Sequence, residues 1–240
     1  MKCLIIAAGQ GTRLRSVAPS KPLAEVGGRP LLEHVVRAAA AGGASGFVVV
    51  TGYRGEAVES FLVGLASRLG LPIECVRNAD WARPNGISVL AAADRLGGPF
   101  ALLMSDHLFD PAILSGLMAT GLGGAELVLA VDRRLDDPRI DLDDATKVET
   151  GESGDIRRIS KALERYDAID TGIFLATPAL FGALRASLAA GGSGSLSEGV
   201  QALAGEGKAR VHDIGPRWWL DVDDEAAFAQ AERALAEPRR

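Results

Sequence analysis

The residues with the clearest chemical meaning lie near the start of the chain. A short apolar run at residues 4–7 is followed at once by a loop that contains Gly9 and Gly11. Glycines let backbone N–H groups approach a ligand closely, so a polyphosphate can settle on such a loop. Arg13 and Lys21 add fixed positive charge. Transfer of a phosphoryl or nucleotidyl group needs this charge, because negative charge builds up on the phosphate oxygens and on departing pyrophosphate.

Other loops share part of this pattern. A glycine pair after a strand also occurs in ordinary tight turns and in dinucleotide-binding loops. The glycines alone do not distinguish these interpretations from a polyphosphate-binding loop. The loop is not a Walker loop, since no Gly-Lys-Ser/Thr follows it. It also departs from the dinucleotide fingerprint, because Leu14 stands where a third glycine is expected and Pro19 and Pro22 would interrupt the helix.

Acidic side chains stand at two later points where a divalent cation could bind. Asp106 follows an apolar run at residues 100–104, and Asp221 and Asp223 are two positions apart near the end of the chain. Residues at i and i+2 of a strand point to the same side, so both later carboxylates can face one cation. Magnesium prefers carboxylate oxygens together with phosphate oxygens and water. The alternative is helix capping, by Asp106 before Pro111 or by Asp223 at the last helix.

A further polar group lies in Asn85-Gly86-Ile87-Ser88. A glycine at the start of a helix allows close approach of a flat nucleobase or ribose, and Asn85 offers both a donor and an acceptor. The alternative, which spacing alone favours, is that Asn85 is an ordinary N-cap. His107 stands beside the first acidic residue, where it could contact an acceptor or simply fill a loop.

Short apolar runs and helical periodicity alternate along the chain. In the first half, strands are expected at 4–7, 47–50, 72–76 and 100–104, and helices at 30–41, 56–69, 86–96 and 111–118. In the second half, strands are expected at 127–131, 146–150, 156–159, 169–176 and 209–214, and helices at 178–188, 196–204 and up to about 235. The pattern predicts an α/β fold with a doubly wound, mostly parallel sheet and a site at the carboxyl ends of its strands.

The composition excludes several classes of protein. With 240 residues, 48% of them apolar, the chain can bury a large core and is too apolar to be disordered. The net charge of −5 argues against a general nucleic-acid binder. We expect neither a leader segment nor a membrane span, since no run of about eighteen apolar residues occurs. Cys3 and Cys75 lack CxxC partners, which favours reduced core residues of a cytoplasmic protein.

The glycine loop and its surroundings resemble the signature of the nucleotidyltransferases that activate sugar phosphates. The matching segments are a strand with Ala-Ala-Gly-x-Gly-Thr-Arg-Leu, then Lys-Pro-Leu, then Val-x-Gly-x-Pro-Leu-Leu, found here at Ala7 to Leu14, Lys21 to Leu23 and Val26 to Leu32. The resemblance implies a Rossmann-like, GT-A-like sheet in one domain over residues 1–240. Residues 1–120 would bind the nucleotide, and residues 121–240 would form a smaller β-rich subregion that binds the acceptor.

Within this family, the chain is most similar to the inositol-1-phosphate cytidylyltransferases. The shared features are Lys21-Pro22-Leu23, Asn85-Gly86-x-Ser88, Ser105-Asp106-His107, Ala145-Thr146-Lys147-Val148, Ser160-Lys161 and Asp170-Thr171-Gly172-Ile173-Phe174. The chain departs from the family at Ser105, where a glycine is more usual. The similarity is weakest around residues 110–140 and 185–212.

The resemblance assigns expected roles to individual residues. Arg13 and Lys21 are expected to be the catalytic residues. The nucleotide would contact Ala7, Ala8, Gly9, Gly11, Thr12, Arg13, Lys21, Asn78, Asn85, Gly86, Ser88 and Asp106. Asp106 and either Asp221 or Asp223 would hold Mg²⁺. Lys161, or as second choice Lys147, would bind the acceptor phosphate, and Asp170, Thr171 and Gly172 would line the acceptor pocket. Glu198 is a further candidate there.

The implied reaction joins CTP and a phosphorylated alcohol, with inositol 1-phosphate as the best match, to give a CDP-alcohol and pyrophosphate. Relatives that activate phosphocholine or phosphonates, and hexose-1-phosphate enzymes that use GTP or UTP, are the enzymatic alternatives. A catalytically dead nucleotide sensor is the non-enzymatic one. The expected partners are these small molecules, with no nucleic acid and no membrane; a homodimer is compatible with the sequence.

Overall fold

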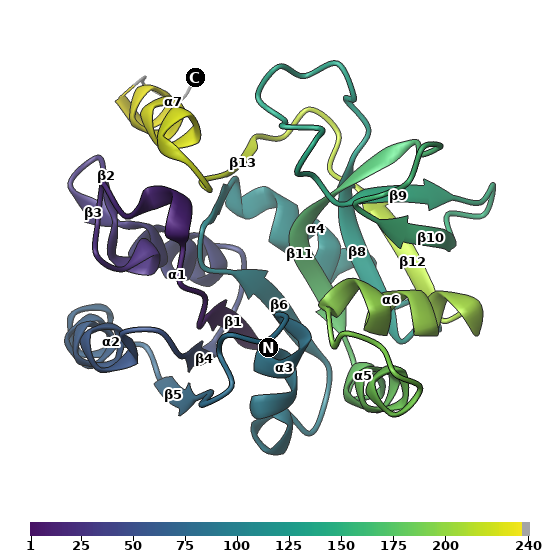
Figure 1. Ribbon diagram of the computed structural model, residues 1–240, viewed down its shortest axis with the longest axis horizontal. Helices are drawn as coiled ribbons and strands as arrows, with labels where there is room; N and C mark the ends of the chain where they lie inside the picture. Colours follow the sequence, from purple (N-terminus) through teal and green to yellow (C-terminus); the bar gives the residue numbers. More distant parts are fainter. Residues whose placement is uncertain (237–240) are drawn as a thin grey trace.

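The computed structural model describes residues 1–236, and the tail expected at residues 238–240 lies outside this range. A nine-stranded sheet forms its centre (Figure 1). Its strands are β1 (Lys2–Ala7), β4 (Gly46–Thr51), β5 (Ile73–Arg77), β6 (Phe100–Met104), β8 (Leu127–Asp132), β9 (Lys147–Thr150), β10 (Ile156–Ser160), β11 (Ala168–Ala176) and β12 (Ala209–Asp213). The helices are α1 (Leu31–Ala41), α2 (Gly55–Leu69), α3 (Gly86–Ala91), α4 (Pro111–Thr120), α5 (Ala179–Ala189), α6 (Leu196–Gly205) and α7 (Glu225–Ala236).

The order of the strands separates a parallel part of the sheet from a mixed part. Strands β5, β4, β1 and β6 are parallel neighbours, as the alternation of strands and helices predicts. Strand β11 then runs antiparallel to β6, and it also pairs with β8 and β9. The predicted hairpin over residues 146–159 is present as β9 and β10. The second half therefore extends the same sheet.

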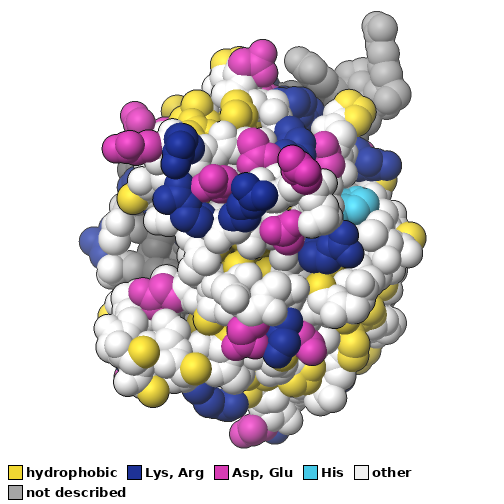
Figure 2. Space-filling view, turned by 90° about the vertical axis from the view of Figure 1, so that its right-hand side faces the viewer, with side chains coloured by type: hydrophobic (Ala, Val, Ile, Leu, Met, Phe, Trp, Pro, Cys, Tyr) yellow, Lys and Arg dark blue, Asp and Glu magenta, His cyan; other side chains and the backbone are white. Residues whose placement is uncertain are grey.

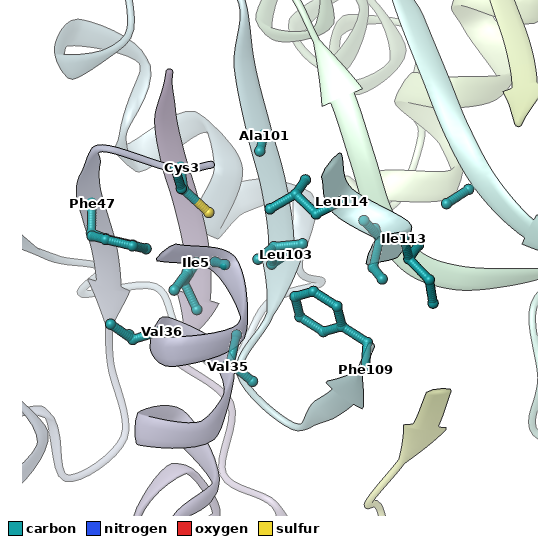
Figure 3. Packing of buried hydrophobic residues seen from close by; sticks show 14 of the residues in the cluster. Cys3, Ile5, Val35, Val36, Phe47, Ala101, Leu103, Phe109, Ile113 and Leu114 are labelled. Carbon is teal, nitrogen blue, oxygen red and sulfur yellow. The ribbon is translucent and has the colours of Figure 1, made fainter. Parts of the chain in front are cut away.

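Helices cover both faces of the sheet, which confirms the doubly wound architecture. Residues Cys3, Ile5 and Ala7 of β1 pack on one face, in a cluster with α1, α2 and α4. Leu4 and Ile6 point to the other face, in a cluster with α3, α5 and α6. Figure 3 shows the first of these clusters from close by. Burial on both faces explains why β1 reads as a continuous apolar run and not as an alternating one.

Some predicted elements have different limits. The helix expected at 86–96 ends at Ala91 and is followed by a 3-10 turn, Ala93–Arg95. The helix expected from residue 30 begins at Leu31, because Pro30 pairs with Glu25 in a short hairpin, β2 (Glu25–Val26) and β3 (Arg29–Pro30). A second short ribbon pairs β7 (His107–Phe109) with β13 (Trp219–Asp221). These two-stranded ribbons are too short to give a periodic signal in the sequence.

A third apolar cluster holds the loop that carries Arg13 and Lys21. It joins the two short ribbons, α7 and the loop after β1, through Leu14, Ala24, Val26, Leu31, Leu108, Leu220, Val222 and Ala231. Leu14 is fully buried next to Arg13, and Val222 is fully buried between Asp221 and Asp223. These apolar neighbours fix the backbone, so the charged side chains beside them project from a rigid base.

Within residues 1–236, none of the helices is both long enough and apolar enough to cross a membrane. Figure 2 views the molecule from the side of the second half, and positive and negative side chains lie next to one another across the upper part of this face.

Candidate active site

A pocket of about 640 Å³ lies at the carboxyl ends of the central strands, and both halves of the chain line it. The first half contributes Gly9, Gly11, Arg13, Lys21, Asn85, Ser88 and Asp106, and the second half Lys161, Asp170, Gly172, Asp221 and Asp223. Ligands of open α/β sheets bind at this edge. The structure therefore brings most of the sequence-predicted site residues into one cavity.

Lys21 is the most buried cation of the pocket, with 7% of its side chain exposed. Its ammonium forms ion pairs with the carboxylates of Asp106 and Asp223. Burial by itself lowers the pKa of Lys21, yet the nearby carboxylates Asp106, Asp221 and Asp223 raise that pKa above its usual value. Lys21 is therefore a fixed positive charge at neutral pH.

Gly11 makes room for this lysine. Its φ is 58°, and a Cβ atom added there would lie 2.3 Å from Cβ of Lys21. Any other residue would both strain the backbone and displace the lysine. In the structure the glycine thus packs against the catalytic candidate itself, whereas a Cβ on Gly9 would meet nothing within 4 Å.

Arg13 joins the two halves of the chain through Asp144. Its guanidinium lies 2.6 Å from Oδ2 of Asp144 and 2.5 Å from Oδ2 of Asp223. The other oxygen of Asp144 is 2.5 Å from the ammonium of Lys161. Lys161 and Arg13 together lower the pKa of Asp144 to about 2. A single carboxylate of the pocket lining is therefore held by one cation from each half of the chain.

Asp106, His107 and Asp221 form a group that could hold a metal ion, with ligand atoms within 4.8 Å of one another. His107 Nε2 is 3.4 Å from Oδ2 of Asp221 and 3.8 Å from Oδ1 of Asp106. The Oδ1 atom of Asp221 is buried and has no hydrogen-bond partner among the described residues. A buried carboxylate oxygen without a donor fits a cation, and carboxylate oxygens are the ligands that Mg²⁺ prefers.

Asp223 differs from this group. Strand β13 ends at Asp221, so the two carboxylates do not lie on one strand as the sequence spacing suggested. Asp221 faces His107, whereas Asp223 accepts hydrogen bonds from Arg13 and Lys21. Both still line the pocket.

The helix-capping alternatives for these aspartates are wrong. The cap of α4 is Asp110, whose Oδ1 accepts a hydrogen bond from the backbone N–H of Ala112 at 2.9 Å. At α7, Oδ1 of Asp224 accepts from the N–H of Ala227 at 2.8 Å. Asp106 and Asp223 are therefore not occupied by the helix termini that follow them.

His107 is buried among acidic groups and backbone. Burial lowers the pKa of its imidazole, but Asp221 and Asp106 outweigh burial and raise this pKa to about 10. The Nδ1–H donates to the carbonyl oxygen of Thr171 at 2.8 Å. His107 is thus an ordered residue of the pocket wall and not a loop filler.

The residues of β11 that are predicted to line an acceptor pocket lie at an irregularity in the sheet. The register between β11 and β8 shifts between Asp170 and Phe174, and Gly172 has a φ of 73°. A Cβ on Gly172 would lie 2.4 Å from Nδ1 of His107. Burial raises the pKa of Asp170 to about 6, against the opposing effects of the Gly172 N–H and of His107. Such bulges often aim side chains into active sites.

Other predicted residues lie outside the cavity lining. The hydroxyl of Thr171 donates to the carbonyl of Ala130. Lys147 donates to the carbonyl of Lys161 at 3.1 Å and lies over the ring of Tyr166, so it supports Lys161 from behind. The carboxylate of Glu198 holds the loop at residues 193–194 through backbone and hydroxyl hydrogen bonds. The remaining residues outside the lining are Ala7, Ala8, Thr12, Asn78 and Gly86.

The side chains that the sequence analysis expects near the nucleobase form hydrogen bonds with one another and with nearby backbone. Asn78 is buried, donates to the hydroxyl of Ser88 at 3.0 Å and accepts from the N–H of Asp80. Asn85 stands at the N-cap position of α3, as the alternative interpretation has it, but its side chain makes no capping hydrogen bond. Its Oδ1 instead accepts from the N–H of Leu196 at 2.8 Å, which ties α3 to α6.

Gly86 is needed for packing. A Cβ there would lie 2.5 Å from the carbonyl oxygen of Gly194 and 2.8 Å from Cδ2 of Leu184. We expect Gly86→Ala to lower the free energy of unfolding by about 1–3 kcal/mol, because backbone must shift to admit the methyl group. Gly182→Ala is the matched control: it adds the same methyl group in α5, where nothing lies within 4 Å, and should stabilise by about 0.5–1 kcal/mol. Urea unfolding of both variants tests this, and equal stability of Gly86→Ala and the native chain would contradict it.

Several pocket residues are absent from the sequence-based prediction. Four polar ones among them are Arg83, Arg139, Asp144 and Gln230. Asp144 stands immediately before the Ala145-Thr146-Lys147-Val148 segment, so an acidic residue beside that segment was the available signal. The others lie in loops or on α7, far along the chain from the glycine loop, and nothing in their spacing marks them.

Comparison with known proteins shows the family of the chain. Residues 3–210 match the family model of the MobA-like NTP transferase domain. The chain is 39% identical to the "Bifunctional IPC transferase and DIPP synthase" of Rubrobacter xylanophilus over 91% of this chain and 48% of that protein. The protein of the same name from Aquifex aeolicus is 31% identical, over 97% of this chain and 51% of the relative. The chain thus spans about half the length of these curated relatives.

Solved structures show the same fold. The inositol-1-phosphate CTP transferase from T. maritima superposes with a TM-score of 0.84 and 25% identity, covering 100% of this chain and 98% of that one. A UDP-glucose pyrophosphorylase complexed with UDP-glucose also gives a TM-score of 0.84, at 17% identity over 99% of each chain, which shows a shared fold. The chain therefore belongs to the MobA-like NTP transferase family, and it is a nucleotidyltransferase.

Proposed function

We propose that the protein is an Mg²⁺-dependent cytidylyltransferase that joins CTP to a phosphorylated alcohol, with inositol 1-phosphate as its acceptor. The observation that carries the proposal is the convergence of Arg13 and Lys21 from the first half and Lys161 from the second half on one pocket. Two phosphorylated substrates need cations on both sides of the reacting phosphorus. The resemblance to relatives named for IPC transferase and inositol-1-phosphate CTP transferase activity supports this choice of substrates.

In the proposed reaction, an oxygen of the acceptor phosphate attacks the α-phosphorus of CTP in line, and the bond to pyrophosphate breaks. Arg13 and Lys21 stabilise the charge that develops on the triphosphate, and Lys161 holds the acceptor phosphate. Asp106 and Asp221 would hold Mg²⁺, which when bound neutralises phosphate charge and orients the triphosphate. Catalysis is then positioning and electrostatic stabilisation, without a covalent enzyme intermediate.

The other contacts follow from position in the pocket. The backbone at Gly9 and Gly11 faces the triphosphate, and Asn85 and Ser88 face the cytosine and ribose. Ala7, Ala8, Thr12, Asn78 and Gly86 would contribute through backbone or by supporting these groups. Asp170 and Gly172, with Thr171 behind them, would line the acceptor site.

Asp144 competes with both substrates for their cations. In the structure it pairs with Arg13 and Lys161, and both pairs must break when phosphates bind. Each exposed pair contributes about 0.2–1 kcal/mol. We therefore expect Asp144→Asn to lower the KM for CTP and for the acceptor by about 1.5- to 5-fold. Steady-state kinetics test this, with the exposed neighbour Asp143→Asn as the control; a raised KM in Asp144→Asn would show that Asp144 contacts substrate instead.

A matrix of nucleotides and acceptors tests the proposed function. Pyrophosphate release with Mg²⁺ is measured for CTP, UTP, GTP and ATP against inositol 1-phosphate, glucose 1-phosphate, mannose 1-phosphate, phosphocholine and 2-aminoethylphosphonate. Turnover confined to CTP with inositol 1-phosphate is the expected result. Turnover of CTP with another acceptor would overturn the acceptor assignment. A preference for UTP or GTP would overturn the nucleotide assignment. No turnover with any pair would favour a nucleotide sensor.

A further inference from the structure

Strand β13 carries Asp221, and backbone hydrogen bonds at its two ends tie it to β7 and its flanks: the N–H of Val222 donates to the carbonyl of Asp106 at 3.0 Å, and the N–H of Asp110 donates to the carbonyl of Trp218 at 2.9 Å. The strand spans three residues and pairs only with β7, which also has three residues. A two-stranded ribbon of this size is marginal by itself. Because Asp221 of β13 stands opposite His107 of β7, any movement of β13 changes the spacing between Asp221 and Asp106.

A buried ion pair connects β13 to the main sheet. Asp132, the last residue of β8, is 1% exposed. Its Oδ2 accepts a hydrogen bond from the indole Nε1–H of Trp219 at 2.8 Å. The guanidinium of Arg134 donates to both oxygens of Asp132, at 2.9 and 2.7 Å. Arg134 also donates to the carbonyl oxygen of Arg217 at 2.7 Å, just before β13 begins.

These contacts hold the strand at two points. Arg134 fixes the backbone before β13, and Asp132 fixes the side chain of its first residue. Trp219 and Asp221 are two positions apart on one strand, so they point to the same side. The indole also lies against the imidazole of His107, with ring centroids 5.9 Å apart. Asp132 is thus linked through Trp219 and His107 to Asp106 and Asp221, the carboxylates that could hold a metal ion.

The carboxylate of Asp132 has no role in the proposed chemistry, which makes its burial informative. It does not line the pocket. An ionised carboxylate is costly to bury unless it is fully paired, and here every contact that pairs it leads to Arg134 or to Trp219. Burial raises the pKa of Asp132, but these hydrogen bonds outweigh it and keep the pKa below its usual value.

We propose that Asp132, together with Arg134, is a positioning residue that sets the distance between Asp221 and Asp106 by clamping β13 through the indole of Trp219. The inference rests on the proposed function only in taking Asp106 and Asp221 as ligands of a divalent cation. An outer partner of this kind typically changes metal affinity by about 10- to 100-fold.

Trp219→Phe tests the clamp, because it removes the indole N–H and keeps an aromatic ring beside His107. The dissociation constant for Mn²⁺ is measured by electron paramagnetic resonance, and thermal unfolding is recorded in parallel. We expect Mn²⁺ binding to weaken by about 10- to 100-fold. Trp218→Phe is the matched control, since it makes the same change one residue earlier, where the side chain packs against the apolar cluster under α7. It should leave Mn²⁺ affinity unchanged.

A second variant covers the case in which Trp219→Phe does not fold. Arg134→Gln removes the contact to the Arg217 carbonyl and leaves Asp132 able to accept from Trp219; we expect it to weaken Mn²⁺ binding in the same direction. Asp221→Asn distinguishes a failure of the positioning role from a failure of the metal site. If it weakens Mn²⁺ binding while both clamp variants bind like the native protein, the positioning role is wrong and the metal site stands. If Asp221→Asn and the native protein bind Mn²⁺ equally, the metal site itself is wrong, and the positioning role falls with it.

Discussion

Lys21→Ala is expected to lower kcat by about 100- to 1,000-fold, the usual effect of removing one preorganised donor to a developing negative charge. Lys21 is the buried cation among Asp106, Asp221 and Asp223, and its ammonium is fixed by ion pairs on two sides. Water that enters the space carries no net charge, so the transition state loses a positive charge that is already in place. The effect should appear mainly in kcat, because charge grows on the leaving pyrophosphate as the bond breaks.

Folding should change far less than turnover. The carboxylates that Lys21 leaves behind are 20% and 32% exposed, so they can regain water or bind Mg²⁺. Lys208→Ala provides the matched control: Lys208 pairs with Glu206 on the surface, and its loss should affect neither turnover nor stability measurably. A folded Lys21→Ala variant with near-native kcat would remove Lys21 from the catalytic machinery.

Asp221→Asn is expected to lower activity at limiting Mg²⁺ by more than about 100-fold, beyond what loss of an outer partner of a metal ligand costs. The reason is the buried Oδ1 of Asp221, which has no donor among the described residues, in a carboxylate that is grouped with Asp106 and His107. An amide keeps the shape of the side chain but loses the charge that attracts the cation. Titrating Mg²⁺ at saturating substrates should show a higher half-maximal concentration and incomplete rescue.

Asp223→Asn is the natural comparison for this variant. Asp223 is 32% exposed and already paired with Arg13 and Lys21, so its loss should change the Mg²⁺ dependence by less than about 10-fold. The sequence pattern allowed either aspartate to bind the metal, and the geometry favours Asp221. The reverse order of effects, with Asp223→Asn the more damaged variant, would overturn this assignment.

The parallel half of the fold follows closely from the sequence, for a physical reason. Apolar runs such as residues 4–7 are buried on both faces, and this leaves a local signal in the chain. The glycine loop is similarly local: Gly11 and Lys21 are ten positions apart and touch. Both features depend on neighbours in the chain, so the residue types alone reveal them.

The features of the fold and of the site that the sequence did not predict depend on contacts between segments that are distant in the chain. Asp144 meets Arg13 across 131 positions, and Trp219 meets Asp132 across 87. The pairing of β7 with β13 involves three residues on each side, too few for a periodic pattern. Asp221 and Asp223 illustrate the consequence: their spacing suggested one strand, but the strand ends between them. Only the folded chain separates their environments.

The central claim is that this pocket joins the α-phosphorus of CTP to the phosphate of an alcohol. The most direct measurement is ³¹P NMR of a reaction with CTP, inositol 1-phosphate and Mg²⁺. If the pocket catalyses this transfer, the signals of CTP and of the phosphate monoester disappear together. A pair of coupled diphosphate-diester signals and a pyrophosphate signal replace them in equal amount. Release of phosphate or CMP without a diester, or an unchanged spectrum at high enzyme concentration with both substrates present, would contradict it.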